Sequence, residues 1–369
     1  MSLTVRVGRC AFFAFALSGV LAFTPASTAR AQEPQLSGKT VEFVIPFAES
    51  GGSAQWANFF APLLSQHLPG KPTVVVRYRP GAGSTAGANW FQQQQKTNDG
   101  TLIFGPSGST QFPYLLGDPR VRYEYKDWKV VLASGTGGVV YLPPQLGKRF
   151  DGDVDDLKKE TFLYGSQGAT TLDLVPLLAF KLLGLKVDPV FGVTGRGDGR
   201  LMFERGEANI DYQTSSAYLK SVVPLVEQKL AVPIFTFGAL DAKGDVVRDP
   251  TFPDLPSFKE VCEATADCET SGTAWEAYKA FFVAGFPAQK LLYLPGSAPQ
   301  KVVDMYTKAI NEIIARPDFA KVSAEVLGDY PQGTGEAAVV AHNLAITVTP
   351  ESKKHVLDWL QADYGVTVK

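Results

Sequence analysis

Four short segments rich in glycine, serine and threonine are the residues of this sequence best suited to hold a small anion. They are residues 50–53, 79–84, 165–171 and, more loosely, 195–198. Each follows a predicted strand and precedes a predicted helix. The first N–H groups of a helix have no partner within the helix and carry a partial positive charge, and glycine lets a ligand come close to them. The four segments therefore predict that a carboxylate- or phosphate-sized ligand is bound mainly by main-chain N–H groups.

The elements that must position these segments alternate between strand and helix. Apolar and β-branched runs predict strands at residues 40–47, 73–78 and 101–104. Between the first two, aromatic and leucine side chains from Trp56 to Leu64 recur every three or four residues, which is typical of a helix with one buried face. This order predicts a mostly parallel sheet with helices on its faces. Ligands of such sheets bind beyond the carboxyl ends of the strands, where all four segments would lie.

A second strand-and-helix unit follows, and its predicted boundaries rest on the same patterns. Ser53 is a predicted cap of the first helix, Thr170 and Asp173 predict a capping box at the start of a later one, and Gly184 predicts where that helix ends. The chain from residue 300 onward is predicted to be helical. The remaining predicted strands are residues 128–132, 139–142, 162–164, 190–193, 208–212 and 231–237, with helices at 172–183 and about 198–204.

Residues 1–31 have the features of a secretory signal peptide. Arg6 and Arg9 precede an apolar run of thirteen residues, 11–23, and residues 29–31 form a small-x-small cleavage site. The run is short for a membrane span, although a retained membrane anchor is the alternative. We therefore expect a periplasmic protein from which the signal peptide has been removed. Residues 32–369 are long enough for two domains.

Composition excludes several functions. The formal net charge of the chain is −2 and no stripe of Lys and Arg occurs, so nucleic acid is not an expected partner. The three histidines all fall in predicted helices, so no histidine-based zinc site is expected. Four aspartates at positions 151, 153, 155 and 156 could suggest calcium, but they lack the glycine and terminal glutamate of an EF-hand loop, so no metal site is expected. Cys262 and Cys268 lie close together in a polar segment. They could form a disulfide in an oxidising compartment or remain free thiols.

Two kinds of motif in the sequence could indicate an enzyme rather than a binding protein. Gly81-Ala82-Gly83 resembles part of a dinucleotide fingerprint, but it follows the second predicted strand, and only Asp99, in a turn, matches the acid expected about twenty residues on. Ser107 and Ser166 lie in segments that miss the G-x-S-x-G pattern by one position. No catalytic residue and no cofactor is therefore expected. A secreted enzyme that uses the Gly81-Ala82-Gly83 loop for a phosphate or nucleotide ligand is the alternative.

Several motifs, taken in their order and spacing, resemble the extracytoplasmic solute-binding proteins of tripartite tricarboxylate transporters, the Bug family. The resemblance covers nearly all of residues 32–369. Each motif is weak alone, and the set is specific. The motifs are Pro46-Phe47 with Gly51-Gly52, VVVRYRPGAGSTAGA at 74–88, NDGTL at 98–102, GSQGATT at 165–171, FPDLPSFKE at 252–260 and LPGSAP at 294–299.

This resemblance implies a two-domain α/β clamshell, each domain a mostly parallel sheet flanked by helices. Domain 1 would combine residues 32–134 with 238–369, and domain 2 would be residues 135–237. A small carboxylate would bind in the cleft between them. The protein would be a monomer that delivers its ligand to the membrane subunits of a tripartite transporter, although a role in sensing is also open.

Carried over position by position, the resemblance implies ligand contacts from five loops and one strand end. The implied ligand-binding residues are Phe47, Glu49, Ser50, Gly51, Gly52, Ser53, Ala82, Gly83, Ser107, Ser109, Ser166, Thr170, Thr171, Gly195, Arg196 and Gln213. For Thr170, Glu49 and the two loop serines, capping, solvent exposure or an ordinary polar loop is the alternative.

Three of these positions predict what kind of acid binds. Ala54 and Gln213 stand where the family often has acids, which weakens the case for an amino-acid ligand. Arg196 lies between two glycines just after a predicted strand. It could pair bidentately with a second carboxylate, an interaction of about 1.5–3 kcal/mol, or it could be a solvated loop arginine. The expected ligand is therefore a di- or tricarboxylate, aliphatic or aromatic.

Overall fold

A computed structural model describes residues 1–6, 8 and 34–368 of the chain. The described part from Pro34 onward forms one compact unit. The apolar run and the cleavage site of the predicted signal peptide lie outside the described residues. Within the described ranges, no helix has both the length and the apolar character needed to cross a membrane.

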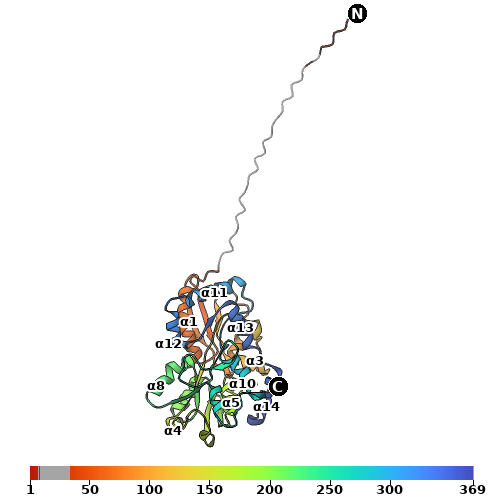
Figure 1. Cartoon of the computed structure of the whole chain (residues 1–369). Coiled ribbons are helices and arrows are strands. Elements are labelled where there is room, and N and C mark those ends of the chain that lie inside the picture. Colours follow the sequence, from red (N-terminus) through yellow and green to blue (C-terminus); the bar gives the residue numbers. More distant parts are fainter. Residues whose placement is uncertain (7, 9–33, 369) are drawn as a thin grey trace. The chain divides into compact units, whose positions relative to one another are not determined.

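The largest sheet has six strands in the order β13-β4-β12-β3-β1-β2 (Figure 1). β1 runs parallel to β2 and to β3, as the sequence predicted. However, β12 is antiparallel to β3 and β4, and β13 is antiparallel to β4, so the sheet is mixed rather than mostly parallel. Strand–helix alternation could not reveal this, because β12 comes from a distant part of the chain. The strands are β1 Thr40–Ile45, β2 Thr73–Tyr78, β3 Leu102–Phe104, β4 Lys129–Ser134, β12 Lys290–Leu294 and β13 Gln332–Gly333.

Helices cover both faces of this sheet because successive side chains of a strand point to opposite sides. In β1, Phe43 and Ile45 share a buried cluster with side chains of α1 (Gly52–His67) and α11 (Gln300–Ile314). Val44, between them, belongs to a different cluster. That second cluster draws on α2 (Thr85–Gln93) and α13 (Gly335–Ala345), while α12 (Phe319–Leu327) joins the first.

Two smaller sheets lie between residues 138 and 236. In one, β5 is the central strand and pairs antiparallel with β8 and β9; in the other, β6 and β7 are parallel. The prediction of mostly parallel pairing is therefore wrong for the first of them. The strand predicted at 190–193 lies earlier in the chain and contains Pro189, which only an edge strand tolerates well. The bounds are β5 Gly138–Leu142, β6 Thr161–Ser166, β7 Lys186–Phe191, β8 Asp211–Thr214 and β9 Val232–Thr236.

The largest buried cluster joins helices from distant parts of the sequence. It combines side chains of α3 (Gly108–Leu116), α5 (Leu174–Leu182), α10 (Gly272–Gly285) and α14 (Pro350–Tyr364). The labels of α5, α10 and α14 lie together in Figure 1, away from those of α1 and α11. The predicted division assigned all of residues 238–369 to domain 1, whereas this packing places α10 and α14 with α5.

The remaining helices and strands are short or connect these layers. Ser257 caps α9 in a capping box with Glu260, and Cys262, in the same helix, is bonded to Cys268, with 5.1 Å between the two Cα atoms. These elements are α4 Pro144–Gly147, α6 Arg196–Glu204, α7 Ser215–Ala217, α8 Val223–Glu227, α9 Phe258–Ala264, β10 Ala239–Leu240 and β11 Val246–Val247.

Candidate functional site

The loop between β1 and α1 is built without a side-chain cap. α1 begins at Gly52 after the N-cap residue Gly51, so the predicted capping by Ser53 is wrong. Ser53 lies inside the first turn, and its Oγ instead accepts a hydrogen bond from Lys290 Nζ at 2.8 Å. Lys290, at the start of β12, is only 4% exposed. Burial lowers the pKa of this ammonium to about 7.

The loop between β2 and α2 has an unusual backbone. Ala82 and Ser84 have positive φ angles of 49° and 89°, a conformation that costs residues other than glycine about 1–3 kcal/mol. Gly81 and Gly83 also have positive φ. The hydroxyl of Ser84 is hydrogen-bonded to that of Thr110, on α3, at 2.9 Å. The surrounding structure therefore holds this turn in one shape.

Asp173 organises the loop after β6. Its carboxylate accepts hydrogen bonds from the Ser166 hydroxyl at 3.1 Å, from the Gln167 N–H at 2.6 Å and from the Tyr212 hydroxyl at 3.0 Å. Thr170 does not cap α5, which starts at Leu174; its hydroxyl contacts Arg120 at 3.3 Å instead. The predicted capping box is therefore wrong, because the chain makes an additional turn before the helix.

Arg196 is where the structure departs most clearly from the prediction. Its side chain is only 7% exposed, and it pairs with Asp211 and, at 3.3 Å, with Asp173. Its Nη1 also donates to the Gly165 carbonyl at 2.6 Å. Burial acts to lower the pKa of Arg196, but the two carboxylates outweigh it and raise that pKa. The prediction of an uncompensated arginine that binds a ligand carboxylate is therefore wrong. Two acids distant in sequence neutralise the guanidinium inside the protein.

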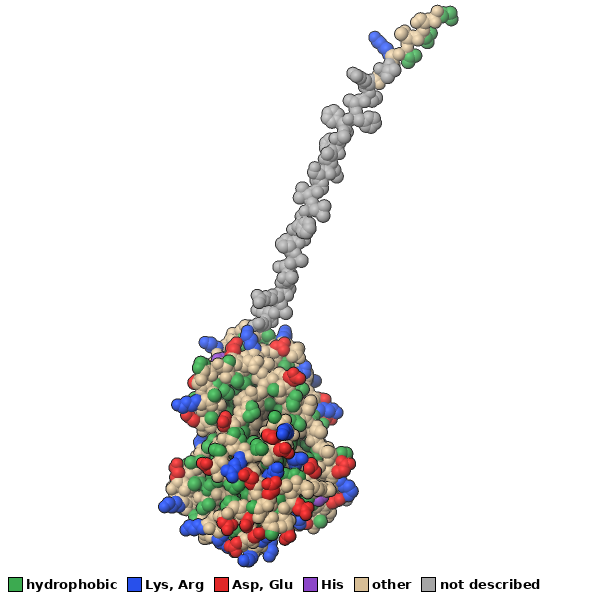
Figure 2. All heavy atoms as spheres, in the orientation of Figure 1, with side chains coloured by type: hydrophobic (Ala, Val, Ile, Leu, Met, Phe, Trp, Pro, Cys, Tyr) green, Lys and Arg blue, Asp and Glu red, His purple; other side chains and the backbone are tan. Residues whose placement is uncertain are grey.

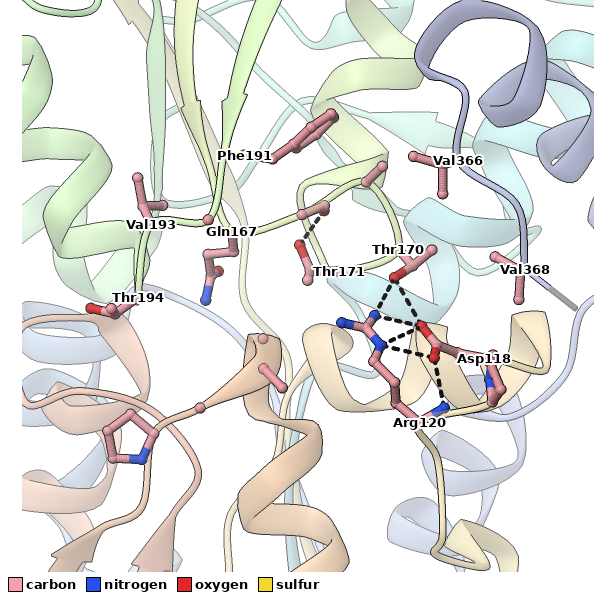
Figure 3. A pocket seen from close by; sticks show the side chains of 18 of the residues that line it. Asp118, Arg120, Gln167, Thr170, Thr171, Phe191, Val193, Thr194, Val366 and Val368 are labelled. Atoms are coloured by element: carbon pink, nitrogen blue, oxygen red, sulfur yellow. Dashed lines mark hydrogen bonds and ion pairs between the residues drawn. The ribbon is translucent and has the colours of Figure 1, made fainter.

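A cavity of about 900 Å³ lies where several of the predicted loops meet (Figure 3). Four predicted site residues line it, namely Ala82, Gly83, Thr170 and Thr171. Gln167 also lines the cavity, and its Nε2 has no hydrogen-bond partner among the described residues. The full lining consists of residues 80–83, 118–120, 167–171, 191–194 and 366–368.

One lining segment, residues 118–120, carries functional groups that the sequence did not suggest. Arg120 follows the end of α3, and its Nε and Nη2 pair with Asp118 at 2.9 and 2.5 Å. The guanidinium side chain is 53% exposed, and its Nη1 has no hydrogen bond to any described residue. Desolvation opposes ionisation of Asp118, but Arg120 outweighs it and lowers the pKa of that carboxyl. Glycine-loop patterns could not find these residues, because they follow a helix.

The other predicted site residues lie outside this cavity lining. Ser107 caps α3, the hydroxyl of Ser109 accepts from the Leu172 N–H at 3.1 Å, and Gln213 Nε2 donates to the Arg196 carbonyl at 2.8 Å. Each of these side chains thus has a partner within the protein. The others outside the lining are Phe47, Glu49, Ser50, Gly51, Gly52, Ser53, Ser166, Gly195 and Arg196.

The loop of residues 48–53 lies directly against two other predicted segments. A Cβ atom placed on Gly197 would lie 2.6 Å from Ser50 Cβ, and one placed on Gly52 would overlap the Thr214 hydroxyl. The Ser216 hydroxyl donates to the Gly52 carbonyl at 3.3 Å. The structure therefore brings these predicted loops together by direct contact, beside the cavity rather than around it.

The distribution of charged and metal-binding side chains limits which kinds of ligand the site could hold. On the face in Figure 2, Lys and Arg side chains are interspersed with Asp and Glu, and no extended basic surface forms there. Among the residues that the structure describes, no group of three or more His, Cys, Asp or Glu side chains could hold a metal ion. The cavity offers amide, hydroxyl and guanidinium donors, which suit an organic anion.

No protein-family model matches the sequence, and no curated protein does. Solved structures do match. The periplasmic binding protein BugD is 21% identical, with 89% of this chain and 98% of that chain covered and a TM-score of 0.60. MatC from Rhodopseudomonas palustris with bound malate is 16% identical, with 86% of this chain and 98% of that chain covered and a TM-score of 0.60. An R. palustris protein with adipate is 16% identical, with 89% of this chain and 98% of that chain covered and a TM-score of 0.63. The chain thus has the fold of periplasmic binding proteins such as BugD and MatC.

Proposed function

We propose that the protein captures a small carboxylic acid in the periplasm and delivers it to the membrane subunits of a tripartite transporter. The observation that supports this most is the convergence of three loops on one cavity. Residues 80–83, 167–171 and 192–194 come from different parts of the chain and all line it. The neighbours with bound malate and adipate have the same fold.

The ligand carboxylate would be held by polar groups on two sides of this cavity. Among the described residues, neither Gln167 Nε2 nor Arg120 Nη1 has a hydrogen-bond partner, and both side chains line the cavity. In Figure 3 dashed lines join the guanidinium of Arg120 to both Asp118 and Thr170. A charge-assisted hydrogen bond from Arg120 would contribute about 1.5–3 kcal/mol. In this proposal Arg120 takes the part that the sequence suggested for Arg196.

Ligand capture would shift the protein toward a closed form. The glycine loop 80–83 belongs to the β2–α2 connection and residues 167–171 to the β6–α5 connection, and a ligand between them contacts both. Binding favours whichever conformation allows both sets of contacts. We further propose that the two sides move as domains; because α10 and α14 pack with α5, the chain would cross between them at more places than residues 134 and 237.

We infer binding without turnover. The alternative, an enzyme that uses Gly81-Ala82-Gly83 for a nucleotide, requires an acid free to bind the ribose. Asp99 is instead engaged by Lys39 Nζ at 2.8 Å and by the Thr101 N–H at 3.1 Å, in the turn before β3. Its position in this turn supports the binding proposal over the enzymatic one.

A ligand screen of the purified mature protein tests the proposal. A carboxylic acid present at a thousand times its dissociation constant should stabilise the folded state by about 4 kcal/mol, seen as a raised melting temperature. Hits are then titrated by calorimetry. The absence of any hit among mono-, di- and tricarboxylic acids would contradict the proposal. So would consumption of a bound acid by the pure protein.

A further inference from the structure

The C-terminal segment of the chain, residues 366–368, lines the candidate cavity. No sequence motif pointed to it. α14 ends at Tyr364, and Gly365 follows with a φ of 64°, which turns the chain out of the helix. The N–H groups of Gly365 and Val366 donate to the carbonyls of Gln361 and Leu360, both at 3.1 Å. The segment therefore leaves the helix in a defined direction.

Side chains alternate along this segment. Val366 and Val368 are partly buried and pack against the large cluster of α5, α10 and α14, while Thr367 is exposed. The Thr367 hydroxyl donates to the side chain of Gln361, on the outer side. In an extended chain, successive side chains point to opposite sides. The two valines thus face the buried cluster together, and all three residues, Thr367 included, contribute to the cavity lining (Figure 3).

A second group of apolar side chains, from another part of the fold, lines the same cavity. Phe191, at the end of β7, and Val193 also line the cavity. The ring of Phe191 packs edge-on against Tyr364, the last residue of α14, with 5.6 Å between the ring centroids. We call Phe191, Val193, Val366 and Val368 the apolar wall. The amide of Gln167 and the guanidinium of Arg120 supply the polar part of the same lining.

We propose that the C-terminal segment is a specificity-determining part of the ligand site, and that the apolar wall selects acids with an apolar chain or ring over hydroxylated acids. This inference rests on the proposed function. Each methylene group moved out of water favours binding about fourfold, whereas a hydroxyl placed against the wall loses its hydrogen bonds to water without replacement. The predicted ligand class is therefore a carboxylate with an apolar body.

Adipate and galactarate form a matched pair of probes, because both are six-carbon di-acids and galactarate differs only by four hydroxyl groups. Calorimetric titration of the mature protein should show adipate bound at least tenfold more tightly. The double substitution Val366→Thr with Val368→Thr keeps the shape of the segment and makes it polar. It should weaken adipate binding about fivefold and leave galactarate binding unchanged. Val340→Thr, on the exposed surface of α13, is the control and should change neither.

Each outcome has a separate meaning. If acids bind but galactarate binds as tightly as adipate, or if the double variant weakens both equally, the specificity inference is overturned and the proposed function stands. If no acid binds, both fail. The melting temperature of each unliganded variant reports folding. If the double variant is destabilised, removal of residues 366–369 gives the second measurement, with the same loss of preference for adipate expected.

Discussion

Single residues show how far chemistry inferred from residue type depends on the partners that a residue finds. Arg196 is the first residue of α6, and Arg120 lies in the loop after α3. Arg196 is buried with Asp173 and Asp211, whereas Arg120 Nη1 has no hydrogen-bond partner among the described residues, despite the pairing of this side chain with Asp118. Only Arg120 is left able to engage an incoming anion.

Arg120→Gln should therefore weaken binding of the cognate acid about tenfold, because a charge-assisted hydrogen bond is lost. Arg122→Gln, two residues away and exposed, is the matched control and should leave affinity unchanged. Titration calorimetry measures both. Equal affinities for the two variants would show that the carboxylate lies elsewhere.

Lys290 gives a pH-dependent prediction. Its pKa is lowered to about 7, and Ser53 is its hydrogen-bond partner. Between pH 7 and the ordinary pKa near 10.5, the unfolded chain binds a proton that the folded protein does not, so stability rises with pH in this window. From pH 7 to pH 9 we expect a gain of about 2 kcal/mol in the free energy of unfolding.

Lys290→Met should remove most of this gain and should stabilise the protein more at pH 6 than at pH 9. Lys301→Met, exposed on α11, serves as the control and should keep the wild-type pH dependence. Urea unfolding at several pH values measures the free energy of unfolding of each variant. A pH profile of Lys290→Met identical to that of the wild type would contradict the assignment.

At the scale of elements, one buried network joins the connections that carry the site. Arg196 at the start of α6 pairs with both Asp173, before α5, and Asp211, in β8. Ser166, at the end of β6, is hydrogen-bonded to Asp173. These connections therefore form a single rigid unit. The glycine segments at 165–171 and 195–198 were predicted separately, and the network explains why they occur together.

Arg196→Met should destabilise the protein by about 3–5 kcal/mol, because it leaves buried carboxylates without their cation. Arg205→Met removes an exposed arginine paired with Glu207 and should leave stability nearly unchanged, because solvent screens such a surface pair. Denaturant midpoints compare the two. A loss below 1 kcal/mol for Arg196→Met would show that the network contributes little.

At the scale of the whole molecule, segments that are distant in the sequence come into direct contact. Gly52 and Thr214 meet so closely that no side chain fits between them, whereas a Cβ atom on Gly51 would meet nothing within 4 Å. If this contact belongs to the closed form that binds the ligand, a methyl group at Gly52 should prevent closure without disturbing an open form in which the two residues separate.

Gly52→Ala is thus expected to weaken ligand binding at least tenfold with little change in melting temperature, and Gly51→Ala should bind normally. Small-angle scattering with and without ligand should show compaction for the wild type and for Gly51→Ala only. Compaction and normal affinity in Gly52→Ala would rule out the proposed role of this contact.

Local pattern was sufficient for much of the fold. β2 was predicted to the residue and β1 and β3 within two residues, and the predicted turn at Ala82 and Gly83 lines the candidate cavity. Periodicity, β-branched runs and glycine positions act over a few residues, so they can be identified from the amino-acid sequence alone. They also gave the α/β class, whereas the resemblance to periplasmic binding proteins rested on a set of sequence motifs in a particular order.

Only the tertiary structure decided which distant groups meet. It paired Arg196 with Asp211, inserted β12 between β3 and β4, and brought residues 366–368 to the cavity. Such contacts depend on the packing of the whole core, and a side chain's ionic partner or solvent exposure is a property of that packing. The sequence alone determined where main-chain donors could face a ligand; the fold determined which side chains remain free to join them.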